Sequence, residues 1–369
     1  MRTLLFLFLV FSLPVFAQQY NLLIGTYTGS GSKGIYVYRF DAKTGTAKWV
    51  SNTDTASNPS YLALAPKGNY VYAVNETGGA NPGSVSAYAF NKSTGALTFL
   101  NKQPTGGDAP CYIAVDKSGR WAVVANYSGG NRAALPIAED GKLQPYAQLI
   151  QDTGSGGDKE RQEHAHVHST VFSPNQHFVF SPDLGTDKIM IYKFNAASQE
   201  PLTPAPQPFA KTEPGSGPRH FTFSPNQKYA YVIEELSGAV TAFKYSNGKL
   251  TFLQHISSHP ANYSGSKGSA DIHISPDGKF LYASNRGDAN SIAVFSVGSN
   301  GKLQLKGVQP TLGIHPRNFM IDPTGQYVLV ANRDSDAVVI FKRNPSTGLL
   351  RDTGNRIEVP KPVCLQMMK

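Results

Sequence analysis

Cysteine is nearly absent from this chain, which has only Cys111 and Cys364 among its 369 residues. A disulfide-stapled fold is therefore excluded, because small folds of that kind depend on several cysteine pairs. The two cysteines fall at strand positions of opposite parity in repeats that are not neighbours. We expect both to be buried, free thiols rather than a pair.

Acidic residues are also scarce, at 25 Asp and Glu against 34 Lys and Arg, which gives a formal charge of +9. The positive excess comes from this shortage of acids rather than from basic runs. No cluster of Lys and Arg interleaved with aromatic residues is present, which argues against a nucleic-acid partner. A small anionic or sugar-derived substrate suits the charge better.

Long apolar runs are missing after the first residues, so we predict no membrane span. Residues 1–17 contain Arg2, an apolar stretch and the small Ala17 before Gln18. This pattern predicts a secretory signal peptide that is cleaved near Ala17, and a mature protein that is periplasmic or secreted. The remaining residues, 18–369, are expected to form a single domain. No pattern in the chain specifies an oligomeric state.

A sustained helical period is absent, and short strand-like segments recur instead at intervals of 47 to 57 residues. Each copy has an apolar alternation, a turn marked in most copies by proline, and a second strand. The copies begin at Pro59, Pro110, Val167, Pro218, Ser269 and Pro316. A repeat of about 50 residues built from strands predicts an all-β fold, the β-propeller, with one blade per repeat.

The two chain ends supply a seventh copy. Residues 362–367 repeat only the first strand of the pattern, whereas residues 22–28 resemble only its second strand. We therefore predict seven blades, with the C-terminus donating the inner strand of the blade that the N-terminus begins. Strand exchange of this kind closes the ring and leaves no free sheet edge within it.

Comparison of the copies shows two kinds of position. Some are apolar in nearly every copy and are expected to pack between blades, whereas others carry different residue types in different blades. One variable column is the first residue after the start of each inner strand, and a second lies just past the end of each second strand. The first column reads Ser60, Cys111, His168, Arg219, Ala270, Arg317 and Val363. The second reads Tyr27, Glu76, Tyr127, Leu184, Glu235, Arg286 and Arg333. Both columns are expected at the same mouth of the channel, where arginines around a carboxylate would suit an anionic substrate.

Three histidines, His164, His166 and His168, alternate along one segment and would share one face of a strand. Metal binding and acid–base chemistry are both open for them. Because no matching ligand is evident in a neighbouring blade, we favour acid–base chemistry. We therefore expect neither a metal nor another cofactor.

Several segments resemble the seven-bladed lactonase family of bacterial 6-phosphogluconolactonases and fungal carboxymuconate cyclases. They include E-H-A-H-V-H-S-T from Glu163, G-S-G-P-R-H-F from Gly215, and P-D-G-K-F-L-Y-A-S-N-R from Pro276. The resemblance covers the chain after its first residues. This chain departs from the family pattern in having Ala165 where proline is usual, and in the additional His164.

The resemblance implies hydrolysis of a sugar lactone, with the related muconolactone chemistry and a non-catalytic binding propeller as alternatives. A metal-dependent lactonase that uses the histidines is a further alternative. The catalytic residues it implies are Glu235, His166, His168, Arg219 and Arg286. Candidates for substrate binding are His220, Arg317, Arg333, Tyr27 and Tyr127. Ester hydrolysis requires a base for the attacking water and positive charge at the developing oxyanion, and these residue types supply both.

Overall fold

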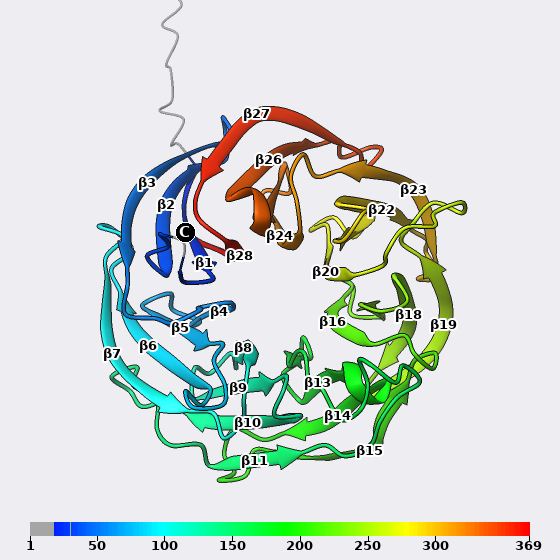
Figure 1. Ribbon diagram of the computed structural model, residues 1–369. Coiled ribbons are helices and arrows are strands. Elements are labelled where there is room, and N and C mark those ends of the chain that lie inside the picture. The colour runs from blue at the N-terminus through cyan, green and yellow to red at the C-terminus, as the bar shows by residue number, and fades with distance from the viewer. Residues whose placement is uncertain (1–17, 30) are drawn as a thin grey trace, which may run out of the picture.

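The computed structural model describes residues 18–29 and 31–369 and contains seven four-stranded antiparallel sheets arranged around a central channel (Figure 1). The predicted seven-bladed β-propeller is therefore confirmed. The predicted signal peptide, residues 1–17, lies outside the described residues. No helix within the described ranges has the length and apolar character needed to span a membrane.

The strands of each sheet run in order from the channel to the rim. The inner strands are β4 (Leu62–Leu64), β8 (Pro110–Val115), β12 (Val171–Phe172), β16 (Pro218–Phe223), β20 (Ser269–Ile274), β24 (Pro316–Ile321) and β28 (Pro362–Met368). The second strands are β1 (Gln19–Thr26), β5 (Tyr70–Asn75), β9 (Trp121–Asn126), β13 (Phe178–Asp183), β17 (Tyr229–Glu234), β21 (Phe280–Asn285) and β25 (Tyr327–Asn332).

The outer half of each sheet completes the blade. The third strands are β2 (Ile35–Asp41), β6 (Ser84–Phe90), β10 (Asn131–Pro136), β14 (Lys188–Phe194), β18 (Ala239–Ser246), β22 (Ser291–Val297) and β26 (Ala337–Arg343). The outermost strands are β3 (Thr46–Thr53), β7 (Leu97–Pro104), β11 (Gln148–Gln151), β15 (Leu202–Lys211), β19 (Lys249–Ser257), β23 (Leu303–Pro310) and β27 (Leu350–Glu358). Two short 3₁₀ turns, η1 (Leu184–Thr186) and η2 (Arg333–Ser335), follow β13 and β25.

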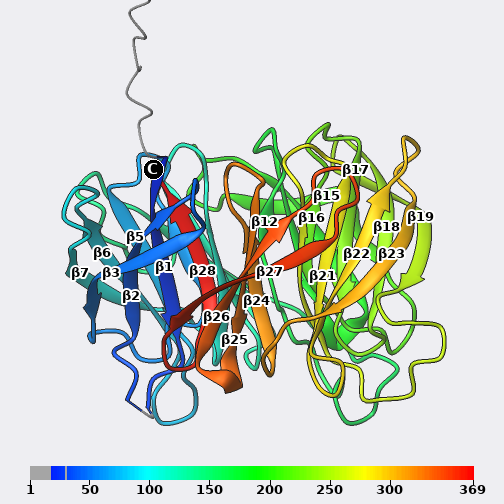
Figure 2. The ribbon, with the colours of Figure 1, turned by 90° about the horizontal axis from the view of Figure 1, so that it is seen from above.

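Both chain ends contribute to one sheet, in the order β28-β1-β2-β3. β28 pairs antiparallel with β1 from Asn21 opposite Met368 to Thr26 opposite Pro362. Figures 1 and 2 show the C-terminal strand lying beside β1, on the channel side of the blade. Sheet hydrogen bonds between the two ends thus close the ring, as the half-copies of the repeat predict.

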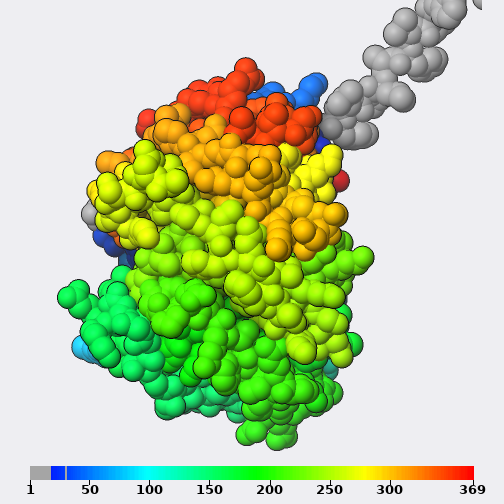
Figure 3. Space-filling view, turned by 90° about the vertical axis from the view of Figure 1, so that its right-hand side faces the viewer, coloured from blue at the N-terminus to red at the C-terminus, as the bar shows by residue number. Residues whose placement is uncertain are grey.

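The hydrophobic core lies between blades rather than inside any one of them. Seven clusters of buried side chains are present in the described residues, and each joins two adjacent blades. One example is Phe180 of β13, which stacks on Phe221 of β16 with ring centroids 5.3 Å apart. In the view from the side, consecutive blades follow one another in colour across the surface (Figure 3). Because each blade buries its faces against two neighbours, no blade is a separate unit.

Irregular pairing marks the start of five inner strands, where the inner strand has one residue more than the stretch of second strand opposite it. The register shifts at Pro110/Tyr112, Pro218/His220, Ser269/Ile272, Pro316/Asn318 and between β28 and β1. Such bulges redirect a side chain from the plane of the sheet. The residues skipped include Cys111, Arg219 and Arg317, which belong to the first variable column of the sequence.

Candidate active site

A cavity of about 360 Å³ opens at one mouth of the channel. The residues that line it include Tyr127, His168, Glu235, Arg286 and Arg317. The two variable columns of the sequence therefore do meet there. The lining also contains Glu76, Cys111, Arg161, Leu236, Lys267 and Gly268.

Glu235 lies at the centre of the charged residues and forms salt bridges with three arginines. Its Oε1 is 2.8 Å from Nη2 of Arg161, and its Oε2 is 2.8 Å from Nε of Arg219 and 2.9 Å from Nη2 of Arg286. Burial alone would raise the pKa of Glu235, but Arg286 and Arg219 hold that pKa well below its usual range. The carboxylate therefore stays ionised at neutral pH and is a weak base.

The three arginines differ in position and exposure. Arg219 projects from the bulge of β16 and lies beneath the cavity, with 1% of its side chain exposed. Arg286 follows β21, and its Nε donates to the carbonyl oxygen of Gly268 at 2.7 Å. Burial lowers the pKa of Arg286 to about 10, so it remains charged. Arg161 comes from a loop and has 46% of its side chain exposed.

His168 is buried beside this cluster, with its Nε2 4.0 Å from Oε2 of Glu235 and its Nδ1 3.6 Å from Sγ of Cys111. Burial, together with the charges of Arg219 and His220, lowers the pKa of His168 well below its usual value. The imidazole is therefore neutral at neutral pH and has a lone pair, although the same surroundings make it a weaker base than an exposed histidine. Burial raises the pKa of Cys111, so its thiol remains protonated and is unsuited to act as a nucleophile.

A second charged group occupies the opposite side of the cavity. The Tyr27 hydroxyl donates to Oε1 of Glu76 at 2.9 Å, and Nη2 of Arg317 lies 3.6 Å from Oε2 of the same carboxylate. The Arg317 guanidinium carbon is 5.3 Å from the centre of the Tyr27 ring. Tyr27 thus contacts the cavity residues Glu76 and Arg317, and lies behind the lining itself.

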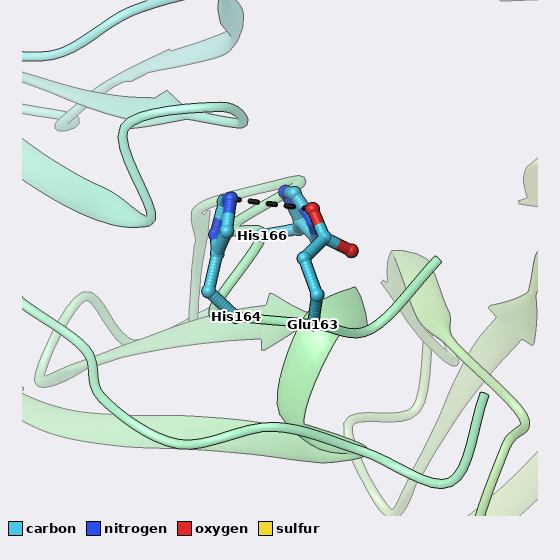
Figure 4. Close-up of side chains that lie close together, drawn as sticks. All are labelled: Glu163, His164 and His166. Atoms are coloured by element: carbon cyan, nitrogen blue, oxygen red, sulfur yellow. Dashed lines mark hydrogen bonds and ion pairs between the residues drawn. The ribbon is translucent and has the colours of Figure 1, made fainter. Parts of the chain in front are cut away.

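The three histidines do not share one face, contrary to expectation. Residues 164–168 form no strand, since β12 begins only at Val171 and Val167 makes a single isolated bridge. His168 contacts the cavity cluster. His164 and His166 instead lie together, with ring centroids 4.2 Å apart, and both contact Glu163 (Figure 4). Burial lowers the pKa of His166, whose ring stacks on Tyr127 at 4.5 Å.

Two other candidates lie away from the cavity lining. His220 is buried, with its Nδ1 2.7 Å from Asp271, and it contacts Arg219 at 3.3 Å, so it supports that arginine from below. Burial and Arg219 lower the pKa of His220 to about 4. Arg333 lies in the η2 turn with Asp334, and its Nη2 is 2.8 Å from the Asp334 carboxylate.

Six cavity residues were not among the sequence candidates, and four of the six have titratable side chains: Glu76, Cys111, Arg161 and Lys267. Glu76 and Cys111 occupy the variable columns, so column membership alone could have identified them. Arg161 lies in the one repeat that is lengthened, where the interval is 57 residues rather than 51. Lys267 lies in a loop between β19 and β20 and has no counterpart in the columns.

Comparison with known proteins matches residues 21–367 to the family model described as lactonase, 7-bladed beta-propeller. The chain is 42% identical to a 6-phosphogluconolactonase from Formosa agariphila over 94% of this chain and 99% of the relative. A Bacillus subtilis protein of the same name is 36% identical over 94% and 97%. The solved structure of the periplasmic gluconolactonase of Pseudomonas aeruginosa superposes with a TM-score of 0.90 at 39% identity, covering 95% and 99%.

The charge cluster predicts a specific pattern of stability. Glu235→Gln removes the anion that compensates Arg219 and Arg286, both largely buried, and should lower the free energy of unfolding by about 3–5 kcal/mol at pH 7. Since the folded pKa of Glu235 is depressed, its contribution is present above the unfolded pKa of about 4.3 and is lost as pH falls through the folded pKa. The deficit of the variant should therefore shrink below about pH 4.3, as measured by denaturant unfolding across pH.

Arg161→Ala is the matched control, because it removes a half-exposed partner of the same carboxylate and should cost about 1 kcal/mol or less. Equal losses in the two variants would contradict a central role for Glu235 in compensating the buried charge.

Proposed function

The chain belongs to the seven-bladed β-propeller lactonase family, and from this membership and the cavity we propose that it hydrolyses a sugar lactone. The observation that carries the proposal is the placement of a neutral, buried histidine beside an arginine-rich, concave site. Both features match what hydrolysis of a cyclic ester requires, namely a proton acceptor and stabilisation of an oxyanion.

In the proposed reaction, a water molecule attacks the lactone carbonyl carbon while His168 accepts the water proton. The ring C–O bond then breaks, and the proton passes from His168 to the departing ring oxygen. Glu235, 4.0 Å from Nε2 of His168, would stabilise the transient imidazolium by its negative charge. Glu235 itself is the weaker candidate for the base, because both of its oxygens are already paired with guanidinium groups, which lower its affinity for a proton.

Arg286 and Arg161 are proposed to donate to the carbonyl oxygen as it becomes an oxyanion. Both reach the cavity and both contact Glu235, which holds them in place before substrate binds. Preorganised donors of this kind act most strongly in a site that excludes water. Arg219 is proposed as a positioning residue, since it lies beneath Glu235 and is buried from the cavity. Arg317 and Glu76, on the other side of the cavity, are proposed to bind the sugar hydroxyl groups.

We predict that His168→Gln lowers kcat on a sugar lactone by about 10²- to 10⁴-fold, because glutamine cannot accept the water proton. Turnover would be followed by acid release on gluconolactone and 6-phosphogluconolactone, with a muconolactone as a third substrate. His166→Gln, whose side chain lies outside the cavity lining, should retain kcat within about tenfold. The reverse order of the two variants would reject His168 as the base. Absence of turnover on every lactone, with binding retained, would favour a non-catalytic module.

Lys267 is proposed to recognise a phosphate group when the substrate carries one. It is an exposed cation at the cavity and forms no salt bridge to another described residue. Lys267→Gln should raise KM for 6-phosphogluconolactone about tenfold and leave KM for the free lactone nearly unchanged, because only the former gains a charge-assisted hydrogen bond. Lys244→Gln, at an exposed position on β18, is the control. An equal rise in KM for both substrates in Lys267→Gln would contradict a role for this residue in phosphate recognition.

Export of the protein is also proposed. Residues 1–17 have the composition of a cleavable signal, and the Pseudomonas aeruginosa neighbour is named as periplasmic. Expression of the full chain in a Gram-negative host should yield a periplasmic protein whose intact mass corresponds to a start at or near Gln18. An uncleaved protein in the cytoplasmic fraction would contradict the proposal.

A further inference from the structure

We propose that Glu163, His164 and His166 form a binding site for a divalent transition-metal ion, with Zn²⁺ as the best-suited ion, at the rim of the cavity. The site is separate from the proposed lactone chemistry. Each of the three residues offers one ligand atom, and these atoms lie within 4.8 Å of one another. Figure 4 shows the three side chains gathered with their polar ends together.

The ligand spacing fits zinc geometry. Zinc–nitrogen and zinc–oxygen bonds of about 2.0–2.2 Å place tetrahedral ligands about 3.3–3.5 Å apart. Nε2 of His164 lies 3.3 Å from Oε1 of Glu163, and Nε2 of His166 lies 3.2 Å from the same oxygen. Two imidazoles and one carboxylate are also a known zinc ligand set, which leaves a coordination position open.

Each histidine also contacts a backbone carbonyl through the ring nitrogen that faces away from Glu163. Nδ1 of His166 lies 3.2 Å from the carbonyl oxygen of Tyr127, and Nδ1 of His164 lies 2.8 Å from that of Ala165. A carbonyl only accepts, so a proton on Nδ1 would satisfy each of these contacts and leave Nε2 free to bind a metal ion. Carbonyl partners of this kind commonly orient metal-binding histidines.

In that tautomer the two Nε2 atoms and the Glu163 carboxylate lie close enough together to share one ion. Without an ion, Oε1 of Glu163 is in hydrogen-bond contact with Nε2 of His166 at 3.2 Å, and a cation bound between the side chains would replace that contact. A bound metal ion satisfies all three ligands at once.

The backbone of this segment is held in place before any ion binds. The His166 amide donates to Oδ1 of Asp183 at 2.7 Å, and the Leu184 amide donates to the carbonyl oxygen of His166 at 2.9 Å. Gly185 permits this approach, since a Cβ there would lie 1.8 Å from the carbonyl oxygen of His164. Arg161 does not oppose a cation strongly, because its guanidinium is paired with Glu235.

The test is titration of the untagged mature protein with ZnCl₂ by calorimetry in a non-coordinating buffer, together with anomalous diffraction from zinc-soaked crystals. We expect one Zn²⁺ per chain, with its anomalous peak between the three side chains. Glu163→Gln and His164→Gln alter exposed side chains and should each weaken binding by at least about 10- to 100-fold. His177→Gln, an exposed histidine elsewhere, should bind as the wild type does.

Absence of zinc uptake at millimolar concentration, a peak at another position, or unchanged affinity in the Glu163 and His164 variants would each overturn the proposal. Because the readout is binding and not turnover, these results stand whether or not the protein hydrolyses a lactone.

Discussion

The pairing of β28 with β1 is the interaction on which the other contacts of the ring depend. Every hydrophobic cluster of the described residues spans two blades, so a blade with one open face would leave much of its apolar surface in water. The blade made from both chain ends packs on two neighbours, through Leu365 on one side and Cys364 on the other. Closure of the ring thus sets the width of the channel, and with it the distances between residues of different blades.

The bulges at the starts of the inner strands allow the blades to differ at the mouth of the channel, although their packing is alike. A regular strand would direct the second residue of these inner strands into the packing between blades. The bulges free Cys111, Arg219 and Arg317 from pairing, and Arg219 then reaches Glu235 from the end of the adjacent strand. The fold therefore tolerates charged residues at this mouth because they lie outside the sheet ladders that hold each blade together.

The sequence allowed the fold and much of the cavity to be predicted, because repeats align residues that lie at equivalent places in the ring. His168, Arg219, Glu235 and Arg286 were identified in this way and do cluster. Equivalent positions in the repeats predict where a Cα atom lies but not where its side chain points. Arg333 was therefore predicted at the cavity, whereas its side chain pairs with Asp334 in the η2 turn. Arg161 lies in a lengthened repeat, where no other copy offers a comparison.

The charges that line the cavity are suited to the negative charge that develops when a lactone is hydrolysed. Arg161, Lys267, Arg286 and Arg317 line it, with Arg219 beneath, against the two carboxylates Glu76 and Glu235. Glu235 partly neutralises three guanidinium groups, which offsets part of the cost of burying them. The remaining positive charge is unmatched by any lining residue. In the proposed reaction, a neutral ester group that becomes an oxyanion would supply negative charge only as the barrier is crossed, so this arrangement would stabilise the transition state more than the ground state.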